Sequence, residues 1–156
     1  MVDIPTSVNG YHADQTRTYI AGEADNEKRD MHAKLKEIAD HVIENMKPGM
    51  ICGDIYRMAV EKSESINAAD AFLSFGGGTK CKMIGHGIGL EVNEPPIINV
   101  SGDMVISENY VIALELHMLR EKIGVMKLED TILIGKNQNE ILTQTPRELT
   151  EIPLRG

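Results

Sequence analysis

Apolar residues recur at helical spacing in the first half of the chain. A stripe between residues 31 and 46 repeats at intervals of three and four, as in a helix that buries one side against a core. An acidic segment at 23–25 and Pro48-Gly49 mark where this helix begins and ends. The apolar members of the stripe are Met31, Leu35, Ile38, Val42 and Met46. We further expect a second helix over about residues 53–64 and a third, shorter one over 68–75.

The second half of the chain contains two long runs of apolar and β-branched residues, 111–119 and 125–134. Runs of this composition predict strands, and the short segment 120–124 between them suits a turn. With a turn centred on that segment, Glu115 lies directly opposite Glu129. Two carboxylates at about 4 Å repel each other by about 4 kcal/mol at an effective dielectric constant of about 20. We expect that only a proton or a metal ion compensates this repulsion.

The N-terminal segment carries a second acidic pair. Asn9-Gly10 is a strong hairpin signal, because both residues tolerate the positive φ that a type I′ turn requires. If the turn lies there, Asp3 lies opposite Thr16 and is a diagonal neighbour of Asp14, with Cβ atoms somewhat under about 7–8 Å apart. Both carboxylates can then reach one ion.

A histidine surrounded by glycines lies between the two acidic pairs in the sequence. His86 is the second residue of Gly85-His86-Gly87-Ile88-Gly89. Glycine at this density weakens a strand unless another backbone or a ligand approaches closely. Single acidic residues on strands are most often solvated, and a lone histidine is most often a hydrogen-bonded core or surface residue. Four carboxylates and one imidazole from two self-consistent hairpins instead favour a metal site with hard ligands.

The composition is that of one soluble domain. The chain has 156 residues, within the single-domain range, and 42% of them are hydrophobic. A formal net charge of −8 argues against nucleic acid and anionic membranes as partners. We expect no membrane-spanning segment and no signal peptide, and therefore a cytoplasmic location. Cys52 and Cys81 lack metal-ligand spacing and are expected to be reduced thiols.

These motifs resemble those of the pita-bread metallopeptidases, which comprise Xaa-Pro dipeptidases (prolidases), Xaa-Pro aminopeptidases and methionine aminopeptidases. The segment from Asp3 to Asp14 is similar to the first metal motif of that family. Residues 85–96 resemble the histidine motif of its proline-specific branch. Glu115 and Glu129 match the two glutamate motifs. The similarity runs over nearly the whole chain.

The resemblance implies an α+β fold, with a curved antiparallel sheet backed by helices, and a site for two divalent metal ions. It assigns Asp3 to one ion, and His86 with Glu115 to the other. Asp14 and Glu129 would bridge both ions. Mn or Co is the expected metal, with Zn or Fe as alternatives. Glu115 and His86 are the expected catalytic residues, with Glu115 as the proton shuttle.

The activity implied by the resemblance is hydrolysis of a peptide bond near a peptide N-terminus, most like the cleavage of Xaa-Pro bonds by proline dipeptidases or aminopeptidases. A peptide substrate and a homodimer are the expected partners. Two alternatives remain open. One is a non-catalytic peptide- or partner-binding module on the same fold, and the other is an amidohydrolase of the creatinase or ectoine-hydrolase type.

The chain departs from the family pattern at three points. Asn93 stands where these peptidases commonly carry a second histidine, and its amide can donate a hydrogen bond to substrate but cannot titrate. Leu116 replaces the proline that usually follows the first glutamate. The segment before the first metal ligand is short, so we expect residues 1–156 to be a single domain, the C-terminal portion of a catalytic domain.

Two further histidines share a face with predicted ligands. By strand alternation, His117 lies on the face of Glu115, and His12 lies on the face of Asp14. Each is a candidate contact to metal or substrate, although a polar role on the strand surface is the commoner case for such residues.

Overall fold

The computed structural model describes residues 1–154 as an α+β domain with two helices and a mainly antiparallel set of strands. The helices are α1 (Asn26–Asn45) and α2 (Cys52–Ser65). The strands are, in chain order, β1 (Val2–Asp3), β2 (Thr6–Val8), β3 (Tyr11–Ala13), β4 (Thr16–Arg17), β5 (Tyr19–Ala21), β6 (Ser74–Gly76), β7 (Thr79–Lys80), β8 (Met83–Gly87), β9 (Glu94–Asn99), β10 (Val111–Arg120), β11 (Gly124–Leu133), β12 (Glu140–Ile141) and β13 (Thr150–Ile152).

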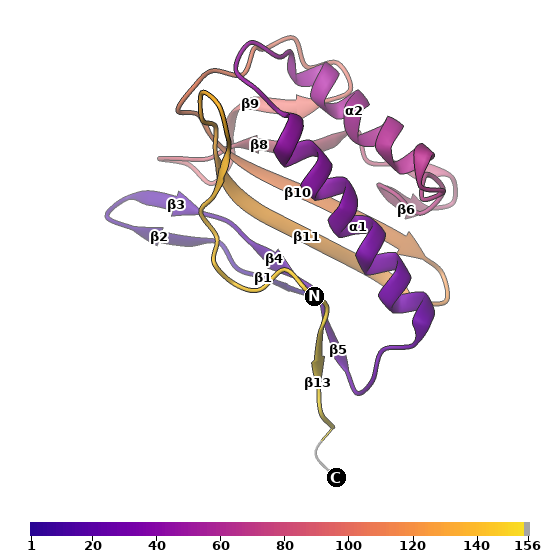
Figure 1. Cartoon of the computed structure of the whole chain (residues 1–156). Helices are drawn as coiled ribbons and strands as arrows, with labels where there is room; N and C mark the ends of the chain where they lie inside the picture. Colours follow the sequence, from indigo (N-terminus) through magenta and orange to yellow (C-terminus); the bar gives the residue numbers. More distant parts are fainter. Residues whose placement is uncertain (155–156) are drawn as a thin grey trace.

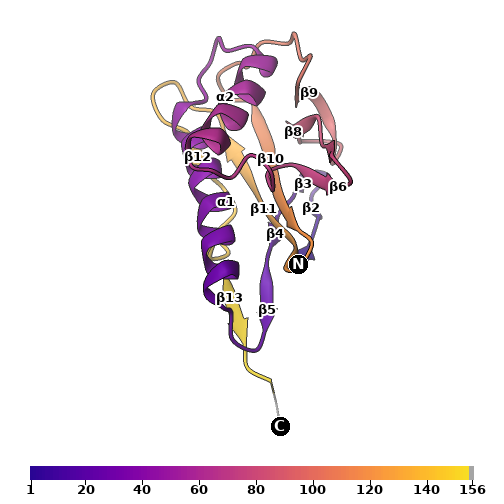
Figure 2. The same cartoon turned by 90° about the vertical axis from the view of Figure 1, so that its right-hand side faces the viewer.

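Seven strands form the central sheet, and both helices cover the same face of it (Figure 1). The strand order is β1-β4-β11-β10-β8-β9, and β12 pairs with β11. Seen from the side, α1 and α2 lie on one side of β10 and β11, and the β2–β3 hairpin lies on the other (Figure 2). Among the described residues, no helix combines the length and apolar character needed to cross a membrane.

Both predicted long helices are present. The carboxylate of Asp25, the N-cap of α1, accepts a hydrogen bond from the backbone N–H of Lys28 at 2.9 Å, which satisfies one free donor of the first turn. Every member of the apolar stripe between residues 31 and 46 is buried. The second helix begins one residue earlier and ends one residue later than expected.

The predicted third helix over residues 68–75 is wrong. These residues form turns and the start of β6, and the backbone N–H of Leu73 donates to the carbonyl of His117 at 2.9 Å. The backbone N–H of Leu119 donates to the carbonyl of Ala71 at 3.0 Å. Leu73 also has a φ of 55°, a left-handed conformation that interrupts a helix. Hydrogen bonds to β10 therefore outweigh the local helix propensity.

β10 and β11 pair along their length in the predicted register, with Glu115 opposite Glu129. Because side chains alternate between faces, the even-numbered residues of both strands point toward the helices. Leu116, at the position where the family has proline, is one of these buried residues. The apolar members of this set are Ile112, Leu114, Leu116, Met118, Met126, Leu128 and Ile132. The odd-numbered residues, Glu115 and Glu129 among them, lie on the opposite face.

The N-terminal hairpin has the predicted turn and register. Asn9 and Gly10 both have positive φ, 53° and 84°. Asp3 pairs with Thr16 between β1 and β4, as expected. Thr16 is in turn the partner of Glu129 of β11, so the N-terminal acidic pair lies beside the second glutamate.

A buried ionic network occupies the helix side of β11. The Oδ1 of Asp130 accepts hydrogen bonds from Arg17 at 2.6 Å and from Thr143 at 2.7 Å, and its Oδ2 accepts one from Arg147 at 2.7 Å. Arg147 also forms an ion pair with Asp40 of α1. The side chain of Asp130 is only 2% exposed, and its charge is balanced on both oxygens. The network ties the C-terminal segment to β11 and α1.

Candidate metal centre

Three side chains from distant parts of the sequence converge on the odd-numbered face of the sheet. Asp14 follows β3, His86 lies in β8, and Glu129 lies in β11. One potential ligand atom of each lies within 4.8 Å of the other two. All three residues are buried. Two carboxylates and one imidazole at this spacing can hold a divalent cation.

Close backbone packing explains the glycines around His86. β8 lies between β9 and β10, and His86 is opposite Ala113. A Cβ on Gly85 would lie 2.6 Å from the carbonyl oxygen of Ala113. A Cβ on Gly87 would lie 2.5 Å from the carbonyl oxygen of Pro95. The expected crowding is confirmed, and the neighbouring strands cause it.

Hydrogen bonds position the two buried carboxylates. Thr16 Oγ1 donates to Glu129 Oε2 at 2.6 Å. Thr131 Oγ1 donates to the backbone carbonyl of Asp14 at 2.8 Å and accepts from its backbone N–H at 3.0 Å. The side-chain Oδ1 of Asp14 is buried and has no hydrogen-bond partner among the described residues. A buried polar atom left unsatisfied costs about 1–3 kcal/mol, so this oxygen calls for a ligand from outside the chain.

The imidazole of His86 is oriented by its own strand. Its Nδ1 lies 3.0 Å from the carbonyl oxygen of Gly87. Because a carbonyl oxygen only accepts, this contact places a hydrogen on Nδ1. Nε2 lies 3.8 Å from Glu115 Oε1, on the side of the cluster. A neutral imidazole with a free Nε2 lone pair is the form that binds a metal ion.

The positive charges of the chain do not fully compensate the negative charges of the two buried carboxylates. Burial raises the pKa of the Asp14 carboxyl, and the neighbouring Asp3 carboxylate raises it further. Burial also raises the pKa of the Glu129 carboxyl, although the hydrogen bond from Thr16 acts in the opposite direction. A cation at the cluster would favour the ionised form of both groups.

Lys127 was not predicted from the sequence as a site residue, yet it lies among the acids. Its Nζ is 3.0 Å from Asp3 Oδ2, 3.0 Å from Glu115 Oε2 and 3.0 Å from Glu129 Oε2. Burial disfavours the ammonium form, but the carboxylates of Glu129 and Glu115 raise the pKa of Lys127 well above its usual value. Strand alternation could have found Lys127, because it lies two residues before Glu129 on the same face.

The five predicted metal ligands fall into two groups. Asp14, His86 and Glu129 form the buried cluster. Asp3 and Glu115 lie beside it, joined to it through Lys127, and their side chains are 41% and 21% exposed. The structure thus gathers all five residues in one region. Their roles as ligands, and the catalytic roles of Glu115 and His86, stay predictions.

The remaining predicted contacts have different surroundings. Asn93 is exposed in the turn before β9, and its role in substrate binding stays a prediction. The Nδ1 of His12 lies 3.3 Å from the carbonyl oxygen of Gly89. The ring of His117 stacks on that of Phe75, with ring centroids 5.1 Å apart and planes inclined by 26°.

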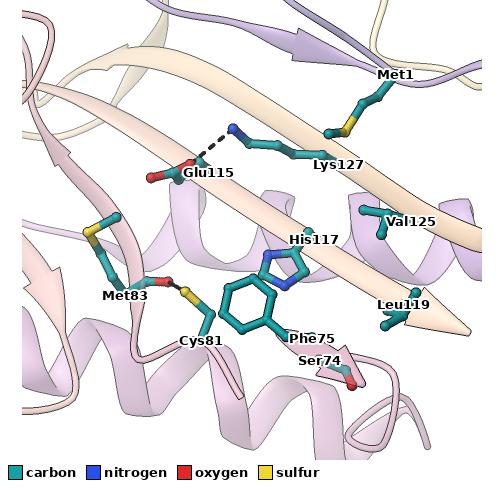
Figure 3. A pocket seen from close by; sticks show the side chains of 10 residues that line it. All are labelled: Met1, Ser74, Phe75, Cys81, Met83, Glu115, His117, Leu119, Val125 and Lys127. Atoms are coloured by element: carbon teal, nitrogen blue, oxygen red, sulfur yellow. Dashed lines mark hydrogen bonds and ion pairs between the residues drawn. The ribbon is translucent and has the colours of Figure 1, made fainter. Parts of the chain in front are cut away.

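Two cavities flank the centre. The first, of about 440 Å³, is bounded by Glu115 and Lys127 and extends toward the β10–β11 turn (Figure 3). The second, of about 540 Å³, is lined by Gly87, Thr131, His12 and other residues of the N-terminal hairpin and of β9. The centre therefore has open space on two sides.

Comparison with protein families accounts for the arrangement of the acids and the histidine. Residues 1–136 match the metallopeptidase family M24, a range that contains all five predicted ligands. The chain belongs to metallopeptidase family M24. This M24 chain is 32% identical over 149 residues to the Xaa-Pro dipeptidase of Pyrococcus furiosus, a match that covers 96% of the chain and 40% of that relative.

The predicted pita-bread fold is confirmed by solved structures. The M24 chain superposes on the X-Pro aminopeptidase from Thermotoga maritima with a TM-score of 0.84 and 27% identity, covering 96% of this chain and 40% of that one. It also superposes on the N-terminal domain of FACT complex subunit SPT16 from chickpea (TM-score 0.76, 22% identity, 92% and 34% covered), a likeness that shows the fold alone. The chain spans about 40% of the length of the curated relatives that it matches.

Proposed function

We propose that this M24 chain carries a dinuclear metal site that hydrolyses Xaa-Pro bonds near a peptide N-terminus. The observation that carries the proposal is the buried cluster of Asp14, His86 and Glu129, in which one carboxylate oxygen has no partner in the described chain. The substrate class is taken from the names of the similar proteins, an Xaa-Pro dipeptidase and an X-Pro aminopeptidase.

The residues at the centre fit divalent cations. Asp3 would hold one ion, His86 and Glu115 would hold the other, and both ions would share the carboxylates of Asp14 and Glu129. Hard oxygen donors and one imidazole suit Mn or Co, with Zn or Fe as alternatives. When bound, such ions supply an activated water and polarise the peptide carbonyl.

The chain's own residues have separate tasks around the substrate. Glu115 borders the first cavity, with Oε2 3.0 Å from Lys127 Nζ and Oε1 3.8 Å from His86 Nε2. Glu115 is therefore in position to exchange a proton with a peptide bound there. The positive charge of Lys127 opposes the effect of burial on the pKa of the Glu129 and Asp14 carboxyl groups. The hydrogen bond from His86 Nδ1 to Gly87 fixes the direction of the imidazole.

Metal content and hydrolysis test this proposal together. Dialysed protein equilibrated with Mn should retain about two ions per chain and hydrolyse Xaa-Pro dipeptides. Glu129→Gln should abolish both metal retention and hydrolysis, because it removes the buried negative charge of a carboxylate that both ions would share. Glu121→Gln is the matched control, since it removes one charge from the exposed β10–β11 turn. Protein that retains no metal in excess Mn would contradict the proposal.

A non-catalytic peptide- or partner-binding module is the second candidate. Asn93, which cannot titrate and stands where these peptidases commonly carry a histidine, favours this module. Retention of metal without hydrolysis of any Xaa-Pro peptide would support this module. An amidohydrolase of the creatinase or ectoine-hydrolase type stays a prediction. So do the homodimer, the cytoplasmic location and the assignment to the C-terminal portion of a catalytic domain.

A further inference from the structure

Lys127 brings a positive charge into contact with three of the predicted metal ligands at once. Its Nζ lies 3.0 Å from Asp3 Oδ2, 3.0 Å from Glu115 Oε2 and 3.0 Å from Glu129 Oε2. Figure 3 shows the side chain extending from β11 toward Glu115. Among residues 1–154, no other lysine or arginine forms an ion pair with the predicted ligands. An ammonium group thus lies among carboxylates that two divalent ions would need.

The contacts of Lys127 involve only one side of the centre. Its ion-pair partners do not include Asp14, whose Oδ1 is buried without a partner in the described chain. The Oε1 of Glu115 also lies on the side of His86, 3.8 Å from Nε2. One ion can therefore bind beside His86 while the ammonium group keeps its place. Asp3, the predicted ligand of the other ion, is held by Lys127.

Charge balance sets the ammonium group against a second ion. Two divalent ions would by themselves neutralise the four predicted carboxylate ligands, so that the ammonium group would become a surplus positive charge. The side chain of Lys127 is 16% exposed and that of Glu129 is 1% exposed, so solvent screens the repulsion between cations poorly here. The ammonium group and a second ion therefore compete for the same oxygens.

The surroundings of Lys127 allow its ammonium group to leave without a change in the sheet. The backbone N–H of Lys127 donates to Thr18 Oγ1 at 3.1 Å, and its carbonyl accepts from the same hydroxyl at 2.9 Å, so this part of β11 is fixed. The side chain borders the first cavity, of about 440 Å³ (Figure 3). Because a lysine carries its charge on a flexible stem, rotation of the side chain can bring Nζ from the acids into this space.

We propose that the ammonium group of Lys127 occupies the second cation position of the centre, and that a second divalent ion binds only by displacing it into the first cavity. This inference rests on the proposed dinuclear function. The affinity for the second ion is lowered in proportion to the fraction of molecules in which the carboxylates hold the ammonium group. Lys127 is thus a built-in competitor that sets the metal concentration at which the centre becomes dinuclear.

Calorimetric titration of the metal-free protein with Mn tests the competition. The wild-type chain should bind two ions in separate steps, and Lys127→Met should tighten the second step by at least about tenfold, as expected if the ammonium group leaves in at most about a tenth of the molecules. Lys127→Arg, which keeps a positive charge, should retain two separate steps. Lys122→Met, which removes a lysine from the exposed β10–β11 turn, is the matched control and should leave both steps unchanged.

Chemical labelling of lysines tests the displacement in the wild-type chain, without any variant. The protein is treated with acetic anhydride at one fixed pH, and the labelled peptides are quantified by mass spectrometry. Lys127 should be protected without Mn and with one equivalent of Mn, and its labelling should rise at least about tenfold when the second ion is bound. Lys122 is the internal control, because its labelling should be the same in all three samples.

The outcomes separate this inference from the proposed function. Release of Lys127 by a second ion without hydrolysis of any Xaa-Pro peptide would keep the inference and reject the catalytic function. Continued protection of Lys127 with two ions bound, or a second step that Lys127→Met does not tighten, would reject the inference even if hydrolysis occurs. Binding of no ion by the wild-type chain would reject both.

Discussion

Glu115 and Glu129 lie directly opposite each other on β10 and β11, and one carboxylate oxygen of each is 3.0 Å from the Nζ of Lys127. Two like charges in a cross-strand pair destabilise a sheet unless a positive charge lies between them. The ammonium group of Lys127 meets this need within the chain, and divalent ions would add to it.

Replacement of Lys127 by Met should destabilise the metal-free protein by about 3 kcal/mol, because it removes the partner of the buried Glu129 carboxylate. Excess Mn should reduce this loss, since bound cations replace the missing charge and stabilise the native state by mass action. Urea unfolding with and without Mn measures both effects. Lys122→Met, in the exposed turn, should change little under either condition. A loss for Lys127→Met that is unaffected by Mn would argue against a cation at this position.

Replacement of Asp130 by Asn should cost about 3–5 kcal/mol of unfolding free energy. The change leaves the buried guanidinium groups of Arg17 and Arg147 without their shared counter-charge. Asp54→Asn, which breaks an exposed ion pair with Arg57, should cost at most about 1 kcal/mol. Chemical denaturation measures the free energy of unfolding of the two variants. Equal losses would show that burial of the ionic network does not add to stability.

His32 of α1 should make stability depend on pH. Burial lowers the pKa of its imidazole, with Glu148 acting in the opposite direction. As the pH falls below the unfolded-state value of about 6.5, the unfolded chain therefore takes up a proton that the folded chain does not. The stability present above that pH should be lost on acidification, by at most about 1.4 kcal/mol per pH unit.

Unfolding of wild-type and His32→Gln proteins between pH 7.5 and pH 5 isolates this contribution. The wild-type protein should lose more stability than the variant over this range. Parallel curves for the two proteins would exclude His32 as the source of the dependence.

Replacement of Gly85 by Ala should disturb the centre through the backbone. The added Cβ would lie 2.6 Å from the carbonyl oxygen of Ala113, so β8 must move away from β10 and carry His86 with it. We expect a destabilisation of about 1–3 kcal/mol together with weaker Mn binding. Thermal unfolding and calorimetric titration with Mn measure the two effects, and unchanged values in both would contradict the tight packing of these strands.

Local sequence signals were enough to predict both hairpins. The Asn9-Gly10 turn determines the register of the N-terminal hairpin. The apolar runs on either side of residues 120–124 determine the register of β10 and β11, and with it the pairing of Glu115 with Glu129. The helix predicted over residues 68–75 does not form, because this segment exchanges hydrogen bonds with β10, a strand that follows it by dozens of residues. Local propensity carries no information about such a partner.

The surroundings of the centre depend on contacts that no short pattern reveals. The unpartnered oxygen of Asp14 and the stacking of Phe75 on His117 each require knowledge of several distant segments at once. Lys127 is a different case, because alternation alone places it on the face of Glu129. Its basic side chain does not resemble a metal ligand, so metal-binding patterns do not include it.

Successive residues of β11 serve opposite sides of the sheet, with Glu129 at the centre and Asp130 in the ionic network with Thr143 and Arg147. Proteolytic removal of the chain from Thr143 onward would therefore lower the affinity for metal through the opposite face of the sheet. Thr143 and Arg147 contact Asp130 rather than the cluster of Asp14, His86 and Glu129, and they anchor the peptide unit from which Glu129 projects.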